Sequence, residues 1–312
     1  MEFKHIPVLL NECLEGLKIK QDGIYVDATL GGAGHSYHIV KKLSSAGHLY
    51  GFDQDAAAIE ASKQHLSSLS LNNYTFIHAN FKEIRQVLET YNVHAIDGAL
   101  FDLGVSSFQL DSGERGFSYN FNTTLDMRMD QRQSLSAYEV VNQYSEKELA
   151  DLIFRYGEEK YARSIARNIV NRRQNEEIRT TFELVDIIKA SIPMKSKMEK
   201  GHPAKRTFQA IRIEVNQELT ILRNSLEETA KLLRSGGRLC VITFHSLEDR
   251  IVKELFKDLT SEPEWNRNMP VRLEKIHLPF RLITNKPITS QEEELTTNNR
   301  AHSAKLRIIE KI

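Results

Sequence analysis

The sequence predicts an α/β protein with a doubly wound, Rossmann-like sheet and an inserted helical domain. Short β-rich runs alternate with helical stretches between residues 23 and 104, and this alternation is typical of parallel βαβ units. A glycine-rich turn follows the first run, which gives the order of strand, turn and helix found at nucleotide cofactor sites. A further strand, residues 237–244, comes only after a long helical segment.

The individual elements follow from the periodicity of the apolar residues. The expected parallel strands are residues 24–29, 48–53, 74–79, 95–103 and 237–244, and the expected helices are residues 37–43, 56–69, 81–91 and 219–233. The last helix ends at Ser235-Gly236-Gly237, because glycine admits the left-handed conformation that stops a helix. Residues 304–309 alternate at period two, which predicts an antiparallel strand at the edge of the sheet.

The segment between the fourth and fifth strands predicts a separate helical domain. We expect residues 111–216 to form this insertion, and residues 1–110 and 217–312 to build the sheet domain, both within the usual size range of domains. Ser145 with Glu148, and Thr180 with Glu183, have the spacing of capping boxes, which start helices. The insertion is therefore expected to be mostly helical.

Two stretches of the insertion are basic, although Lys+Arg and Asp+Glu both total 42 in the whole chain. Residues 160–173 hold five basic side chains and no acidic one, and residues 195–212 hold six against Glu199 alone. A solvated helix face and a phosphate-binding surface are about equally compatible with this pattern. In the second case the candidate RNA-binding residues are Arg163, Arg167, Lys205 and Arg206.

The glycine turn favours a cofactor without a pyrophosphate. Gly31, Gly32 and Gly34 allow a sharp turn and a close approach of the main chain to a ligand. Counting G-x-G-x-x-G from Gly32 puts Tyr37 in place of the third glycine, so S-adenosylmethionine fits better than a dinucleotide. Asp53 ends the second expected strand 22 residues after Gly31, close to the spacing of about 20 at which an acidic residue meets a ribose.

Asp102 is the predicted catalytic residue. It ends the fourth expected strand, beside the point where a doubly wound sheet reverses direction and ligands bind. Its carboxylate can hydrogen-bond an amine of the cofactor or substrate, or accept a proton. Gln109 follows closely enough to reach the same crevice with a donor and an acceptor. The ring of Phe81, after the third strand, either packs on an adenine or joins the core.

The segment after the fifth strand has a simpler structural interpretation. Ser246 is expected to cap the next helix, with Glu248 and Asp249 complementing its dipole. Only His245 and Arg250 then need a functional explanation.

Composition excludes several other classes of protein. His35 and His38 lack partners at metal-ligand spacing, and Cys13 and Cys240 form neither a disulfide framework nor a Cys-x-x-Cys site, so we expect no metal. The N-terminus lacks the features of a secretory signal, and no apolar run approaches membrane-spanning length. The sequence therefore predicts a cytoplasmic protein with no membrane partner.

Several blocks resemble one protein family. They are DATLGGAGHS (residues 27–36), FDLGVSS (101–107), LDMRMD (125–130), KRTFQA (205–210) and FHSLEDR (244–250). In this order they resemble the RsmH (formerly MraW) family of bacterial 16S rRNA cytosine-N4 methyltransferases. The resemblance implies a class I S-adenosylmethionine-dependent methyltransferase fold with a helical insertion. It also implies methylation of one cytidine in the decoding region of 16S rRNA within the small ribosomal subunit.

The same resemblance implies a set of cofactor contacts. These fall on Ala33, Gly34, His35, Asp53, Phe81, Asp102 and Gln109. Residues 299–303, NRAHS, depart from the Ser-Ala-Arg or similar triplet that the family often shows, so this segment has no predicted role. A homodimer is compatible with the sequence, which does not determine the oligomeric state.

Two alternatives of other classes stay open at this point. An NAD-dependent dehydrogenase is favoured by Asp53 and disfavoured by Tyr37. A ribosome assembly factor that keeps the fold only for binding is the non-enzymatic alternative. Methylation at C5 of cytosine is disfavoured because it needs a cysteine nucleophile near the fourth strand, and Cys13 and Cys240 lie elsewhere in the sequence.

Overall fold

The chain forms two compact units in a computed structural model that describes residues 7–69, 71–106, 109, 113–193, 201–262 and 278–312. Unit 1 consists of Met1–Gly104 and Leu219–Ile312, and unit 2 of Val105–Glu218. Unit 2 therefore begins and ends a few residues outside the expected insertion, residues 111–216. Each unit has its own buried core.

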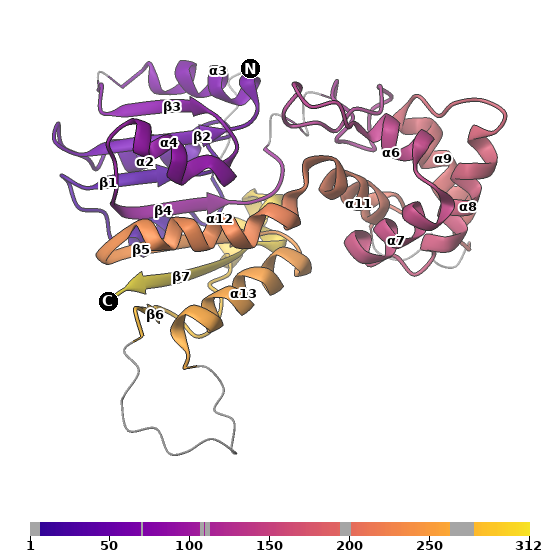
Figure 1. Cartoon of the computed structure of the whole chain (residues 1–312). Helices are drawn as coiled ribbons and strands as arrows, with labels where there is room; N and C mark the ends of the chain where they lie inside the picture. The colour runs from indigo at the N-terminus through magenta and orange to yellow at the C-terminus, as the bar shows by residue number, and fades with distance from the viewer. Residues whose placement is uncertain (1–6, 70, 107–108, 110–112, 194–200, 263–277) are drawn as a thin grey trace, which may run out of the picture. The chain divides into compact units, whose positions relative to one another are not determined.

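Unit 1 is built on a seven-stranded sheet with the order β3-β2-β1-β4-β5-β7-β6 (Figure 1). The strands are β1 (Ile24–Asp27), β2 (His48–Asp53), β3 (Tyr74–His78), β4 (Ile96–Asp102), β5 (Leu233–Thr243), β6 (Phe280–Leu282) and β7 (Lys305–Lys311). The first five pair in parallel. The chain runs outward from β1 to β3 and returns to β4 beside β1, so the switch point of the sheet lies between β1 and β4.

One expectation about the sheet is wrong in part. β7 is antiparallel to β5 as expected, but it does not lie at the edge, because β6 pairs with its other side. Arg281 of β6 forms an ion pair of 2.5 Å with Glu310 of β7, between guanidinium Nη2 and carboxylate Oε1. A strand of three residues is too short to show a period, so no sequence pattern predicts β6.

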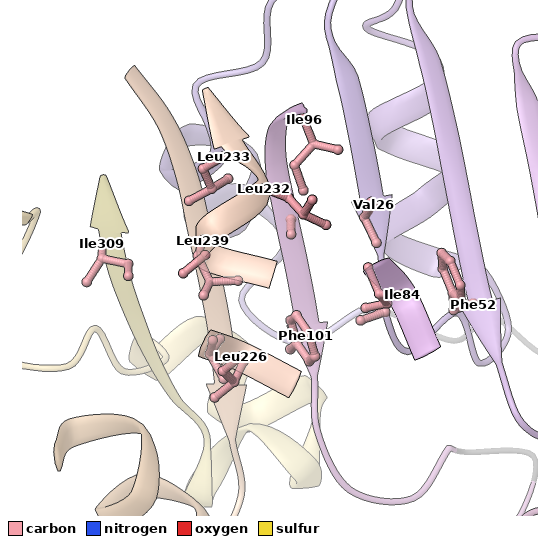
Figure 2. Packing of buried hydrophobic residues seen from close by; sticks show 14 of the residues in the cluster. Val26, Phe52, Ile84, Ile96, Phe101, Leu226, Leu232, Leu233, Leu239 and Ile309 are labelled. Carbon is pink, nitrogen blue, oxygen red and sulfur yellow. The ribbon is translucent and has the colours of Figure 1, made fainter. Parts of the chain in front are cut away.

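Helices cover both faces of the sheet. One face carries α1 (Leu10–Leu17), α2 (Gly34–Val40) and α3 (Ala56–Leu66), and the other carries α4 (Ile84–Thr90), α12 (Glu218–Leu232) and α13 (Ser246–Thr260). Shorter elements are η1 (Phe81–Glu83), α14 (Glu292–Thr297) and η2 (Asn299–Ser303). Figure 2 shows Phe101 of β4 and Leu239 of β5 in the same core as Ile84 of α4 and Leu226 of α12. Their neighbours Leu100 and Cys240 belong to the opposite core, as the alternation of a strand requires.

Unit 2 is helical. Its helices are α6 (Ala137–Gln143), α7 (Glu146–Gly157), α8 (Ala162–Arg173), α9 (Thr181–Ser191) and α11 (Lys205–Asn216). The expected capping boxes at the starts of α7 and α9 are confirmed, and Ser136 with Glu139 forms a third at the start of α6. None of the helices in the described part of the chain is long and apolar enough to span a membrane.

The LDMRMD block has a structural role within unit 2. The carboxylate of Asp126 accepts two hydrogen bonds from the guanidinium of Arg128, at 2.7 and 3.0 Å. Asn216 at the end of α11 accepts from the main-chain N–H of Met129 and donates to the carbonyl of Met127, both at 2.8 Å. These contacts hold the loop before α6 against α11.

Candidate active site

Three carboxylates lie at one edge of the parallel sheet. Asp27, Asp53 and Asp102 are the last residues of β1, β2 and β4, which are neighbours in the order β2-β1-β4. Because parallel strands end at the same edge, these acids surround the switch point at which doubly wound sheets bind ligands. The site is therefore acidic, although the chain as a whole has no net charge.

The glycine turn leads into its helix earlier than expected. α2 begins at Gly34 rather than near Tyr37, and Ala33 precedes it in the left-handed conformation with φ 58°. The hydroxyl of Ser36 donates to Asp27 Oδ2 at 2.6 Å, which fixes the first turn of α2 on the end of β1. The sequence places the start too late because this buried contact has no counterpart in the apolar periodicity. Gly31 also has a positive φ, 52°.

Asp53 holds the glycine turn. Its Oδ2 accepts from the main-chain N–H of Gly31, and its Oδ1 accepts from that of Asp55, both at 2.8 Å. Burial, with help from the charges of Asp55 and Asp27, raises the pKa of Asp53 to about 7. Each carboxylate oxygen accepts one hydrogen bond here and has a second lone pair, so the pair of oxygens can still accept two hydroxyl groups of a ribose.

Asp102 carries the unsatisfied group of the site. Its main-chain N–H donates to Thr29 Oγ1 at 2.6 Å, and its Oδ2 lies 3.6 Å from His35 Nδ1. Its Oδ1 is buried and has no hydrogen-bond partner in the described part of the chain. An unpaired buried acceptor costs about 1–3 kcal/mol, so a ligand that donates to Oδ1 would remove this cost.

The charges around Asp102 favour a cationic ligand. Burial first, and then the negative charges of Asp27 and Glu248, raise the pKa of Asp102 to about 8, whereas Arg300 opposes them. Such a site repels a pyrophosphate and attracts positive charge. These carboxylate acceptors fit S-adenosylmethionine, which carries a sulfonium, an ammonium group and the hydroxyls of a ribose.

Two of the predicted cofactor-binding residues, Phe81 and Gln109, do not lie on strand ends. Phe81 is the first residue of η1, and its half-buried ring packs edge-on against Phe101 with the centroids 5.6 Å apart. Gln109 is buried in unit 2, where Ser106 N–H donates to its Oε1 at 3.0 Å. The cofactor contacts of both residues stay predictions, as do those of Ala33, Gly34 and His35.

Comparison with known proteins decides the family. A family model described as the MraW methylase family matches residues 2–312. The chain belongs to the MraW methylase family. Curated relatives named Ribosomal RNA small subunit methyltransferase H, from Clostridioides difficile (strain 630) and Exiguobacterium sibiricum, are each 53% identical to it. The first covers 100% of both chains over 312 residues, and the second 99% of both over 310 residues.

Membership of this methylase family makes the chain a methyltransferase with a class I fold, and it decides against the dehydrogenase alternative.

The structure also corrects one detail of the FHSLEDR block. His245 rather than Ser246 caps α13, and Glu248 accepts from the main-chain N–H of His245 and of Phe244, the latter at 2.8 Å. Asp249 instead pairs with Lys305 and Arg307 of β7. No group of acidic, histidine and cysteine side chains suited to a metal ion occurs among the described residues.

Asp27, Glu248 and Arg300 act on the acids of the site, a role that the sequence analysis did not predict for them. Asp27 had a detectable signal, because it ends a strand directly before the glycine turn. Glu248 and Arg300 had none, since their charges act on Asp102 from α13 and η2, which are far along the chain.

We expect the ligand-free methyltransferase to become less stable as the pH rises from 7 to 9. Aspartate in an unfolded chain titrates near pH 4, whereas the pKa of Asp102 in the folded protein is about 8. Between pH 4 and pH 8 the folded protein binds a proton at Asp102 that the unfolded chain does not bind. The free energy of unfolding therefore falls as the pH rises, until Asp102 is ionised above its pKa of about 8. The slope below pH 8 approaches about 1.4 kcal/mol per pH unit for this group. Urea unfolding at a series of pH values measures this pH dependence of the free energy of unfolding.

Between pH 7 and pH 9, few other side chains contribute to the pH dependence of stability. His38, His48 and His202 have lowered pKa values and titrate below this range, and Asp53, with a pKa of about 7, contributes only at the lower end of the range. Asp102→Asn should flatten the dependence, and an equally steep dependence in that variant would contradict the assignment.

The four candidate RNA-binding residues are all exposed. Arg163 and Arg167 lie one turn apart on α8, and the guanidinium Nε of Arg167 is 3.9 Å from Glu146 Oε1, a weak exposed pair. Lys205 and Arg206 open α11, where Arg206 Nη1 donates to the carbonyl of Glu158 at 3.2 Å.

Other arginines of the same basic stretches have internal partners. Arg173 donates to the carbonyls of Val141 and Tyr144, and Arg212 forms a two-bond pair with Glu218 at 2.8 and 2.9 Å. The described parts of the basic stretches therefore combine structural arginines with exposed ones, and there the exposed ones are available to phosphate.

Proposed function

We propose that this chain transfers a methyl group from S-adenosylmethionine to N4 of one cytidine in the decoding region of 16S rRNA, within the small ribosomal subunit. The observation that carries this proposal is the buried, unpaired Oδ1 of Asp102 at the switch point of a methyltransferase sheet. The relatives' name, which refers to the small-subunit ribosomal RNA, supports the substrate. The site of action is the cytoplasm, and a homodimer is compatible with the proposal.

The chemistry requires one acceptor for the reacting amine. The N4 amine of cytosine is a poor nucleophile because its lone pair is delocalised into the ring, so positioning is the main task. Oδ1 of Asp102 accepts one N–H of the amine and directs the nitrogen lone pair away from the carboxylate. When bound, S-adenosylmethionine supplies a methyl group on a positively charged sulfur. The bound cofactor would keep the carbon–sulfur electron pair when the methyl group leaves it, and its positive charge would favour the ionised form of Asp102. The Asp102 carboxylate can then accept the proton that the nitrogen loses.

The cysteines support attack by nitrogen rather than methylation at C5. Methylation at C5 needs a thiolate that adds to the pyrimidine ring. Cys13 and Cys240 are both buried, and burial raises the pKa of the Cys240 thiol to about 12. Neither thiol is suited to that role.

Methyl transfer to isolated small subunits tests the proposal. Subunits from a strain that lacks the enzyme should accept about one labelled methyl group each from S-adenosylmethionine, and mass mapping should place it on N4 of one cytidine. Binding to the subunit without transfer would instead support the assembly-factor alternative. Transfer to another atom or nucleotide would retain the methyltransferase and overturn the proposed product.

Replacing Arg163 and Arg167 together by Gln should weaken RNA binding and reduce its salt dependence. Each lost phosphate contact lowers the slope of log K against log salt by about 0.7–0.9, so the double variant should lose about 1.5 from the slope. Filter binding of the small subunit or its RNA over a range of salt concentrations measures this.

Arg85 and Arg223 provide a matched control. Both are partly exposed and paired, with Glu228 and Asp258 respectively, in unit 1. Replacing both by Gln removes the same charge and should leave the slope unchanged. An unchanged slope in the Arg163 and Arg167 variant would restore the interpretation of a solvated helix face.

A further inference from the structure

Residues 7–9 lie against the first turn of α2, beside the cofactor turn. A Cβ atom built on Gly34 would be 2.6 Å from Pro7 Cγ, so the absence of a side chain at Gly34 permits this close approach. The next residue, His35, is buried, and its Nε2 lies 3.0 Å from the carbonyl oxygen of Val8. The N-terminal segment thus contacts the residue that faces Asp102.

The same segment is anchored from the C-terminal part of the chain. The main-chain N–H of Leu9 donates to Glu294 Oε1 of α14 at 2.9 Å. Leu9 is fully buried and adopts a left-handed conformation with φ 53°. That conformation costs a branched residue roughly 1–3 kcal/mol and persists only where the surroundings impose it. The position of Val8 is therefore determined by contacts on both sides.

The Val8 carbonyl determines the tautomer of His35. A carbonyl oxygen only accepts, so Nε2 must carry a proton and donate it. Nδ1 then faces Asp102 Oδ2 at 3.6 Å, a distance longer than a hydrogen bond and typical of catalytic pairs before the ligand binds. Two unprotonated acceptors would repel each other here. Below the Asp102 pKa of about 8, the His35 and Asp102 pair therefore holds one proton between Nδ1 and Oδ2.

We propose that His35 is a positioning residue that holds Asp102 with Oδ1 directed at the reacting amine, and that residues 7–9 hold the His35 ring in the required tautomer. This inference rests on the proposed function. The two ring nitrogens face Val8 and Asp102, so we expect hydrogen bonds of His35 to the cofactor to come from its main chain. Among the described residues, the other charged and titratable groups that act on Asp102 are Asp27 of β1, Glu248 of α13, Arg300 of η2 and Cys13 of α1.

Two amide variants of His35 test the contacts of its two ring nitrogens one at a time. His35→Asn places an amide near the position of Nδ1, facing Asp102, whereas His35→Gln reaches towards Val8 and leaves Asp102 without its partner. A small displacement of a catalytic group costs up to about 100-fold. We expect His35→Gln to lower kcat by about 10- to 100-fold and to shift its pH profile, with the Kd for S-adenosylmethionine within about threefold of wild type. His35→Asn should recover part of kcat.

His38 on the same helix is the matched control, because Lys41, Lys42 and His65 rather than Asp102 act on it. His38→Gln should leave kcat and its pH profile unchanged. If His35→Gln does the same while the wild type is active, the inference is overturned and the proposed function stands. If the wild type neither binds the donor nor transfers methyl groups, the proposed function itself fails.

A measurement on the ligand-free protein is independent of activity. Nitrogen-15 NMR of labelled histidine should show His35 with its proton on Nε2, and its titration should change in Asp102→Asn but not in Asp97→Asn. A neutral ring with the proton on Nδ1 would overturn the inference, as would a titration that is unaffected by Asp102→Asn.

Discussion

Asp102→Ala should lower the rate of methyl transfer by about 10²- to 10⁴-fold, the range that a positioned acid or base contributes. The carboxylate is the only part of the residue that the substitution removes, since the main-chain N–H can still donate to Thr29 Oγ1. The variant also removes a buried, unpaired acceptor, so the ligand-free protein should not lose stability at pH 7 through this site. Single-turnover transfer of labelled methyl groups to small subunits measures the rate directly.

Asp97→Asn is the control for this prediction. Asp97 lies on the same strand as Asp102 but near its other end, where it pairs with Lys20 and Arg234. At a temperature where both variants are folded, we expect Asp97→Asn to retain activity within about twofold of wild type. Asp102→Asn, which keeps the shape and loses the charge, should resemble Asp102→Ala. Activity of Asp102→Ala within twofold of wild type would remove this residue from the mechanism.

The sheet and the acids at its edge are the part of the molecule that local sequence patterns encode. The five parallel strands are apolar runs that end in turns, and Asp53 and Asp102 stand at the ends of two of them, so periodicity alone places them. The capping boxes of α7 and α9 are likewise local, because a hydroxyl and a carboxylate three residues apart satisfy each other's main-chain N–H groups.

The features that the sequence does not reveal depend on contacts between distant residues. The contact between His35 and Val8 spans 27 residues, and the hydrogen bond between Leu9 and Glu294 spans 285. Such pairs leave no period or spacing in a single sequence. The start of α2 is mispredicted for a related reason, because Ser36 is held by the buried carboxylate of Asp27 rather than by an apolar stripe. The geometry of the catalytic carboxylate thus depends on the tertiary fold.

Asp53→Ala should raise the Kd for S-adenosylmethionine by about 100-fold, or roughly 3 kcal/mol. The substitution removes the acceptors expected to bind the ribose hydroxyls, and hydrogen bonds to a charged group contribute about 1.5–3 kcal/mol each. It also releases the N–H of Gly31, so the glycine turn loses one of its fixed points. Isothermal titration calorimetry with the full-length protein measures the Kd, and the unfolding temperature in the same buffer reports any loss of the fold.

Asp55→Asn separates the ribose contact from a general loss of negative charge. Asp55 lies two residues away and caps α3 by accepting from the N–H of Ala57 at 3.0 Å, which an asparagine can also do. In a buffer well above the Asp53 pKa of about 7, Asp53 is ionised and the charge change equals that of Asp53→Ala, so a purely electrostatic attraction of the cationic donor would weaken in both variants. A ribose contact predicts that only Asp53→Ala loses affinity. Equal losses in the two variants would assign the affinity to the acidic field of the site and leave Asp53 as a residue that shapes the turn.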